Sequence, residues 1–537
     1  MTHQMLMTFF AGTQILFAFA FGSCVGSLIN VLAYRMPLGL SVVTPPSRCP
    51  KCDHLLSWRD NIPVFGWLFL RGKCRFCKTR ISPEYPIVEA FVGLIFVLFY
   101  VLWYIVPDHG AVWLGFDWSM LKPEWAMNGF GRTWPIFVTL LVMVSSLIAM
   151  TIIDARTFTI PLSLTWTPAI VALVAHPLWA AWLAFRGTLW RYTAAGEWWA
   201  IPTPGESGWP MLCAAFGGLL GLLIANVLLG LGLIRRSFAD YDEWEAKALA
   251  EAGIEPEEAA HQPGVEGERD EEEKAATSRN THSRSAAVVA ACMVMGAVLG
   301  GLVAGKALGI PAALGALAGI LVAIPLAGSI CRAIGRGSGK DTPAVEGEPK
   351  TADEGTPAEM WIQYPHARRE VCKELIFLAP CIGLAVVGWF VGARLGAPWS
   401  VDPVTYDLVA SRAIPLWCSV LGGVAMGYLI GGGIVWAIRI FGTLGFGKEA
   451  MGLGDVHLLA AVGAAVGWID ALLAFFVAPF IALYIVLLQT TWTGNGRKAM
   501  PYGPYLAMAT LAVVLGKVGF EAALAQMFGS SVPLDFP

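Results

Sequence analysis

Charged residues are scarce in this chain. Asp, Glu, Lys and Arg make up 14% of its 537 residues, whereas 56% are hydrophobic and the mean hydropathy is +0.62. A soluble domain carries about 25% charged residues, so the composition excludes an ordinary soluble domain. Apolar runs of about 20 residues recur along most of the chain, and each is long enough to cross a bilayer as a helix. The sequence therefore predicts an all-α polytopic membrane protein.

Basic residues are absent before the first apolar run, and Arg35 directly follows it. A secretory signal has the opposite order, with a basic start and a small-residue cleavage site. We therefore expect residues 1–34 to form a retained transmembrane helix with its N-terminus outside. Because Lys and Arg concentrate in cytoplasmic loops, the loop that follows should be cytoplasmic.

Nucleotide-binding patterns are also missing. The stretch "GSGK" at 337–340 lacks both the spacing of a phosphate loop and a preceding strand. We expect membrane lipid as a partner and no nucleic acid, and the sequence predicts no oligomeric state.

The apolar runs predict about twelve transmembrane helices, which we place near residues 8–33, 86–106, 135–153, 164–185, 211–234, 286–306, 309–333, 374–394, 413–441, 456–469, 470–491 and 503–520. An acidic stretch with scattered Gly and Pro predicts a mostly disordered cytoplasmic linker at 240–285, because it cannot bury enough apolar area to offset the cost of ordering. The predicted organisation is a first helix at 1–34, a cytoplasmic loop at 35–85, helices at 86–185, a segment at 186–411 with about four helices and the linker, and helices at 412–525.

Four of the eleven cysteines form two CxxC pairs, Cys49 with Cys52 and Cys74 with Cys77, which are separated by 21 residues. Two such turns supply the four thiolates of a tetrahedral Zn²⁺ site. A structural zinc site in the 35–85 loop is our main interpretation. A disulfide pair conflicts with a reducing cytoplasmic compartment, and redox catalysis would need only one pair. We expect the tetrad to shape the loop and to perform no chemistry.

Two carboxylates lie where the helix pattern brings them to the same side of the membrane. Asp154 ends the third predicted helix, and Asp455 follows Gly452 and Gly454 in "GLGD". Two close carboxylates share a proton, so that one can act as a base toward water and the other as an acid. Each also has a structural interpretation, Asp154 as a helix-end charge and Asp455 as a helix cap.

Other acids and the glycines have secondary roles in this interpretation. Glu89 lies on the same side and could tune the pair or hold a helix, whereas Asp470 falls toward the opposite side. The glycines Gly452 and Gly454 would let backbone or a substrate strand approach Asp455 closely.

These elements together resemble the prepilin peptidase family, which are polytopic aspartic proteases. The resemblance covers "GSCVGSLINVLAYRMP", the loop with the cysteine tetrad, "IDARTFTIP", "GKEAMGLGDVHLLAAVGA" and "MPYGPYLAM", about half of the chain. The family implies that Asp154 and Asp455 are the catalytic pair. It also implies cleavage of the basic leader of type IV prepilins or type II secretion pseudopilins at the cytoplasmic face of a bacterial inner membrane.

The resemblance further implies N-methylation of the new N-terminus with S-adenosylmethionine, although the sequence shows no methyl-donor pocket. The main departure from the family is length, since residues 186–411 read as an insertion. Its four predicted helices are an even number and so keep both aspartates on one side.

Two functions of other classes fit the same residues. A proton- or cation-coupled transporter could use the intramembrane acids as an ion path. A non-catalytic scaffold of a secretion machine could use the cysteine loop alone.

Overall fold

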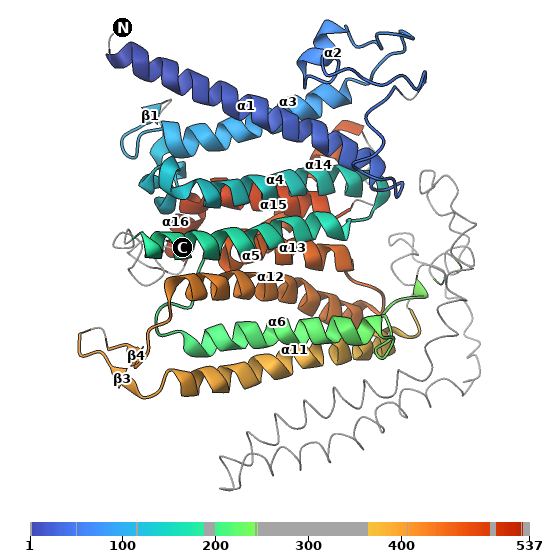
Figure 1. Ribbon diagram of the computed structural model, residues 1–537. Helices are drawn as coiled ribbons and strands as arrows, with labels where there is room; N and C mark the ends of the chain where they lie inside the picture. Colours follow the sequence, from blue (N-terminus) through green and yellow to red (C-terminus); the bar gives the residue numbers. More distant parts are fainter. Residues whose placement is uncertain are drawn as a thin grey trace. The chain divides into compact units, whose positions relative to one another are not determined.

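The computed structural model describes residues 3–49, 51–113, 116–186, 199–241, 244, 247, 364–404, 406–493, 501–527 and 529. The predicted linker at 240–285 and the predicted helices at 286–306 and 309–333 fall almost wholly outside these residues. The structure is mostly helical, as the composition predicts (Figure 1).

The long helices are α1 (His3–Arg35), α3 (Glu84–Tyr100), α4 (Phe130–Thr157), α5 (Leu162–Phe185), α6 (Trp209–Gly230), α11 (Ala367–Leu395), α12 (Leu416–Phe446) and α14 (Trp468–Thr493). The shorter helices are α2 (Phe65–Phe69), α13 (Leu453–Val466), α15 (Gly503–Leu515) and α16 (Lys517–Met527). A π-helical turn at Val101–Ile105 extends α3, and 3-10 turns lie at Trp118–Leu121 and Glu124–Asn128.

Two short antiparallel ribbons complete the described elements. In the first, β1 (Val112–Trp113) pairs with β2 (Phe116–Asp117). In the second, β3 (Trp399–Val401) pairs with β4 (Leu408–Ala410).

Eight of the described helices are long and apolar enough to cross a bilayer, or nine if α15 and α16 together form one broken span. The chain is therefore a multi-pass membrane protein. The prediction of about twelve spans is not confirmed, because two of the twelve lie outside the described residues and two others differ from what was predicted.

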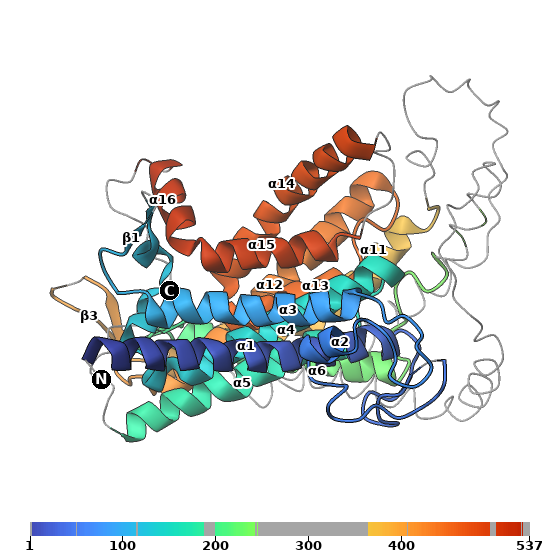
Figure 2. The ribbon, with the colours of Figure 1, turned by 90° about the horizontal axis from the view of Figure 1, so that it is seen from above.

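The helix predicted at 456–469 is α13, which has only 14 residues. It ends before Gly467, whose φ of 100° is open to glycine but strained for other residues. The helix predicted at 503–520 is two helices that meet at Gly516 with a bend of 86°. Figure 2 shows α16 turned sharply away from α15.

The chain forms two compact units, and residues 1–208, 398–436 and 452–537 make up the first. Within it, α4 packs against α1, α5, α13 and α15, and α13 also packs against α5, α14 and α15. Every residue of α13 from Asp455 to Val466 is buried except His457. A helix that is apolar on all sides belongs in the interior of a bundle, so α13 forms the centre of this unit.

The second unit comprises residues 209–397 and 437–451. Here α6 and α11 pack as an antiparallel pair over their whole length (Figure 1). Glycines on both helices allow this, because a Cβ on Gly221 would lie 2.2 Å from the carbonyl oxygen of Pro380, and one on Gly388 would lie 2.1 Å from that of Cys213. Small residues at a helix interface let backbones approach closely in membranes.

Candidate functional site

Asp154 lies three residues before the end of α4 and is only 5% exposed. The helix ends at Thr157, and the left-handed residue Phe158 that caps it donates its N–H to the carbonyl oxygen of Asp154. The Asp154 carboxyl group therefore points from the last turn of a buried helix, and the backbone N–H of Gly503 donates a hydrogen bond to it.

Asp455 lies in the first turn of α13 and is 8% exposed. The helix is capped at Gly452 without a side-chain hydrogen bond, so Asp455 does not act as the predicted helix cap. Asp455 lies near enough to both the Asp154 carboxyl group and the Tyr502 hydroxyl for their charges to interact. The structure thus brings together two carboxyl groups that are about 300 residues apart in the sequence.

Glycines surround this pair at the start of two helices. A Cβ on Gly503, the first residue of α15, would lie 2.6 Å from Oδ2 of Asp154 and 3.2 Å from Cδ1 of Ile160. A Cβ on Gly454 would lie 3.0 Å from Cβ of the same Ile160. The loop after α4 therefore packs between the first turns of α13 and α15. Because Gly503 has no side chain, the Asp154 carboxyl group can occupy the space beside it.

The predicted supporting residues have different surroundings. A Cβ on Gly452 would meet Oδ2 of Asp455 at an ordinary contact distance of 3.7 Å. Glu89 accepts a hydrogen bond of 2.6 Å from the backbone N–H of Val64, and one from Ser27. Val64 directly precedes α2 and has a positive φ of 62°, so Glu89 binds the backbone at the start of the loop helix.

Two neighbouring buried carboxyl groups are suited to acid–base chemistry. When two such groups lie close together, ionising both is unfavourable, and the favoured state carries one proton for the pair. The protonated group is then an acid, and the ionised group is a base.

The four predicted cysteines also come together. Their Sγ atoms all lie within 4.8 Å of one another. The Sγ atoms of Cys49 and Cys77 are 3.8 Å apart, and those of Cys52 and Cys74 are 4.0 Å apart. Tetrahedral ligands with Zn–S bonds of about 2.3 Å have sulfurs about 3.8 Å apart, so the donor set fits this ion.

The two CxxC turns have the same backbone structure 25 residues apart. The N–H of Cys49 donates to the carbonyl oxygen of His54, and the N–H of Cys74 donates to that of Thr79. After each second cysteine, the next residue is left-handed, Asp53 with φ 53° and Lys78 with φ 59°. Such a turn directs both sulfurs to one point.

Backbone amides also favour the thiolate form in these turns. The N–H groups of Cys52 and Lys51 lower the pKa of the Cys49 thiol. The backbone amide and the hydroxyl of Thr79 lower the pKa of the Cys77 thiol to about 6. Burial and the neighbouring thiols instead raise the pKa of Cys52 to about 11. The thiolate is the form that binds metal, so two of the four thiols favour that form without a cation.

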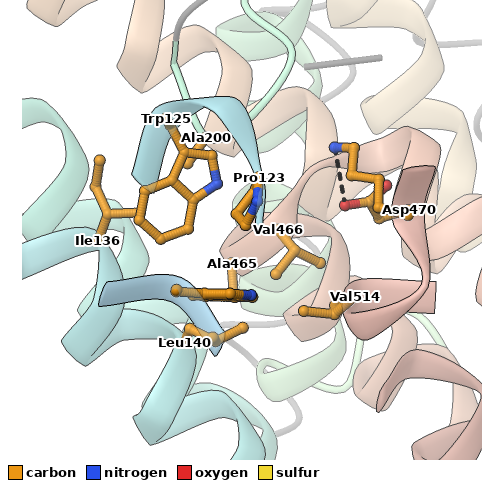
Figure 3. A pocket seen from close by; sticks show the side chains of 11 residues that line it. Pro123, Trp125, Ile136, Leu140, Ala200, Ala465, Val466, Asp470 and Val514 are labelled. Carbon is orange, nitrogen blue, oxygen red and sulfur yellow. Dashed lines mark hydrogen bonds and ion pairs between the residues drawn. The ribbon is translucent and has the colours of Figure 1, made fainter. Parts of the chain in front are cut away.

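The rival acid Asp470 lies in a separate place. It forms an ion pair of 3.4 Å with Lys517 in a cavity of about 30 Å³ lined by aromatic and aliphatic side chains, including Trp125 and Val466 (Figure 3). Val466 ends α13, eleven residues from Asp455, which is about 16 Å along a helix axis. A cavity of this size holds about one water molecule.

Sequence reasoning missed Gly503 as part of the site. The signal is present in "YGPYL", where a proline follows the glycine at the start of a helix, a position at which proline is favoured. What the sequence does not show is that the carboxyl group of a distant helix fills the space of the missing side chain.

Comparison with known proteins shows two kinds of similarity. The sequence model described as the bacterial peptidase A24 N-terminal domain matches residues 20–103, which include the cysteine tetrad. A prepilin leader peptidase/N-methyltransferase of Myxococcus xanthus is 36% identical over 189 residues, covering 35% of this chain and 48% of that protein. A protein of the same name from Klebsiella pneumoniae is 44% identical over 88 residues, covering 15% of this chain and 39% of its own length.

A third relative is the type 4 prepilin-like proteins leader peptide-processing enzyme of Escherichia coli, which is 36% identical over 107 residues, covering 17% of this chain and 39% of that enzyme. The chain thus spans about half or less of the length of these relatives. No solved structure matches the chain significantly.

The role of Glu89 in holding the loop predicts a local change in hydrogen exchange. In Glu89→Leu the Val64 N–H loses its acceptor, and an unsatisfied buried donor costs about 1–3 kcal/mol. We expect amide exchange around Val64 to rise about tenfold or more, as measured by mass spectrometry of peptides from the loop. Glu89→Gln keeps an acceptor oxygen and should change it little, and equal exchange in the two variants would contradict the assignment.

Proposed function

Because this chain belongs to the prepilin peptidase family, we propose that it cleaves the leader peptide of type IV prepilins or type II secretion pseudopilins. The three relatives are named for this reaction or for processing such leaders. The observation that carries the proposal is the meeting of two buried carboxyl groups, Asp154 and Asp455, at the ends of packed helices.

In the proposed mechanism, the aspartate pair hydrolyses a peptide bond directly. The ionised carboxylate takes a proton from an attacking water while the protonated carboxyl group donates to the peptide. The Gly503 N–H holds the Asp154 carboxyl group in place at the start of α15, where the helix dipole favours negative charge. Burial keeps bulk water from the pair.

The proposal includes an orientation in the membrane. We propose that the N-terminus of α1 lies outside and that the cysteine loop and both aspartates lie at the cytoplasmic face of a bacterial inner membrane. The basic residues of the 35–85 loop support this placement. Within the described part of the insertion at 186–411, α6 and α11 are the two helices that could cross the membrane, an even number that keeps both aspartates on one side.

We include methylation of the new N-terminus in the proposal because two of the relatives are named as N-methyltransferases. S-adenosylmethionine would supply the methyl group. The cavity beside Asp470 is far too small for that molecule, since ligand pockets measure about 300–1,000 Å³. We therefore assign no residue of this chain to the methyl donor.

For the cysteine cluster we propose a structural Zn²⁺ ion bound by Cys49, Cys52, Cys74 and Cys77. The sulfur spacing and the two matching turns support it. The ion would stabilise the loop, and all four ligands being protein sulfurs leaves no open position for a reaction.

The catalytic proposal predicts that Asp154→Asn and Asp455→Asn each lower leader cleavage by about 10²–10⁴-fold, because either change removes the acid–base partner. The assay is mass spectrometry of a co-expressed prepilin's N-terminus, which also reports methylation. Asp470→Asn is the matched control, a buried acid outside the pair, and should still cleave when compared at equal folded amounts. Unchanged processing in either dyad variant, with altered ion flux, would instead support a transporter.

The packing at Gly503 predicts a second effect on cleavage. In Gly503→Ala the new methyl group would lie 2.6 Å from Oδ2 of Asp154 and must displace it. A shift of about 1 Å in a catalytic group can cost on the order of 10²-fold in rate. Gly433→Ala, where the Cβ would meet nothing within 4 Å, is the control. Equal kcat in both variants would show that this close contact is not needed.

Metal analysis tests the zinc proposal. The purified chain should contain one zinc per molecule, and Cys74→Ser should lose it and lower the melting temperature, because a closed four-sulfur site stabilises a loop with little core of its own. Cys213→Ser, which changes a cysteine outside the tetrad, should keep the metal. A metal-free wild-type chain with an unchanged melting temperature would contradict the assignment.

A further inference from the structure

The segment just before Gly452 is held tightly within the second unit. The N–H of Tyr364 donates to the carbonyl oxygen of Gly447 at 2.7 Å, and the N–H of Gly447 donates to that of Thr443 at 2.9 Å. The N–H of Ala450 reaches the Thr443 hydroxyl at 3.4 Å. The chain is thus fixed on its way from α12 to the motif that carries Asp455.

A buried arginine makes the last contact of this segment. Arg439 is only 2% exposed, and its Nη1 donates to the carboxylate of Glu449 and to the backbone carbonyl of Met451. Met451 is followed directly by Gly452 in the chain. The planar guanidinium presents its donors in a fixed fork, so these bonds set the direction of the backbone where the motif begins.

Arg439 pairs with two carboxylates, and the more buried of them comes from the inserted part of the sequence. Its Nε donates to Oε1 of Glu374 in α11 at 2.6 Å, and Glu374 is itself 2% exposed. Ser237 donates to the same oxygen at 3.2 Å, and the ring of Phe238 lies 4.9 Å from the guanidinium. A buried arginine needs such a partner, because an unpaired charge in the interior is strongly destabilising.

The same inserted segments are fixed to one another beside the arginine. Phe238 donates its backbone N–H to Oε2 of Glu370 at 2.8 Å, and Lys373 forms an ion pair with that carboxylate at 2.6 Å. Tyr364 donates its hydroxyl to Asp240 at 2.9 Å. The two ends of the stretch that the structure leaves undescribed, near 241 and 364, therefore meet at this cluster.

We propose that Arg439 is a positioning residue for the peptidase reaction, and that Glu374 holds it in place. Arg439 fixes the Met451 carbonyl and with it the start of the Gly452–Asp455 motif, while the insertion supplies the more buried of the two carboxylates that order Arg439. The inference rests on the proposed function for its catalytic consequence. It gives the insertion a role in the reaction, which a simple spacer between helices would not have.

The experiment compares full-length purified variants in a prepilin cleavage assay. Arg439→Lys keeps a positive charge, but its single nitrogen cannot bind Glu374 and, at the same time, Glu449 and Met451, which Arg439 contacts through Nε and Nη1 respectively. We expect its kcat to fall about 10- to 100-fold at equal folded amounts, because the displaced motif misplaces Asp455, with KM within about twofold. Arg394→Lys, on an exposed part of α11, is the control and should match wild type.

Coupling between the two residues gives a second readout. Glu374→Gln should lower kcat in the same way, and adding it to Arg439→Lys should cost little more, because residues that act as one unit are not additive. A wild-type kcat in Arg439→Lys, or a loss that only follows the amount of folded protein, would overturn the inference. So would fully additive effects.

Hydrogen exchange separates this inference from the proposed function. Peptides that cover 447–456 should exchange faster in Arg439→Lys than in wild type, whether or not the chain cleaves a prepilin. Unchanged exchange there would overturn the positioning role even if cleavage is confirmed. A wild-type chain that cleaves nothing while this exchange difference is present would instead count against the proposed function alone.

Discussion

The burial of two carboxyl groups in an apolar helix bundle is the constraint on which the rest of the first unit depends. Asp154 and Asp455 are each less than a tenth exposed. A charged side chain at the bilayer centre costs about 3 kcal/mol even on the mildest scale, and two together cost more because they repel. The bundle limits this cost by holding the pair at helix ends, where the Gly503 N–H reaches Asp154. Such an arrangement stabilises one shared proton, and that is the state in which a carboxyl pair can work as acid and base.

Much of the fold could be predicted from the sequence, because a transmembrane helix is a long apolar run. Each of the eight long helices that the structure describes corresponds to one such run. The predictions that differed concern the segment after Asp455, where apolar residues continue almost without interruption. There the breaks depend on single glycines, Gly467 and Gly516, and a window of 20 residues averages over them. The cysteine tetrad was predictable down to its four members, since the spacing of CxxC pairs is fixed by the geometry of the turn.

The site could be predicted only in its carboxylates. Nothing in the local sequence shows that Gly503 leaves space for Asp154, or that Glu89 binds the backbone at Val64, because both depend on contacts between distant segments. The role of Arg439 could not be predicted either. In the sequence it is one charged residue in an apolar helix, and its partners come from α11 and from the segment after α12. Its contacts bring a carboxylate of the insertion and the residue directly before Gly452 to one guanidinium.

The most direct test of the central claim measures the proximity of the two acids without relying on activity. A chain with Asp154→Cys and Asp455→Cys is treated in membranes with a short thiol-to-thiol crosslinker, and the digested protein is examined by mass spectrometry. The account predicts a linked peptide pair that joins positions 154 and 455, and none between 154 and 470 when Asp470→Cys replaces Asp455→Cys. Failure to link 154 with 455, or equally frequent linking of 154 with 470, would contradict it.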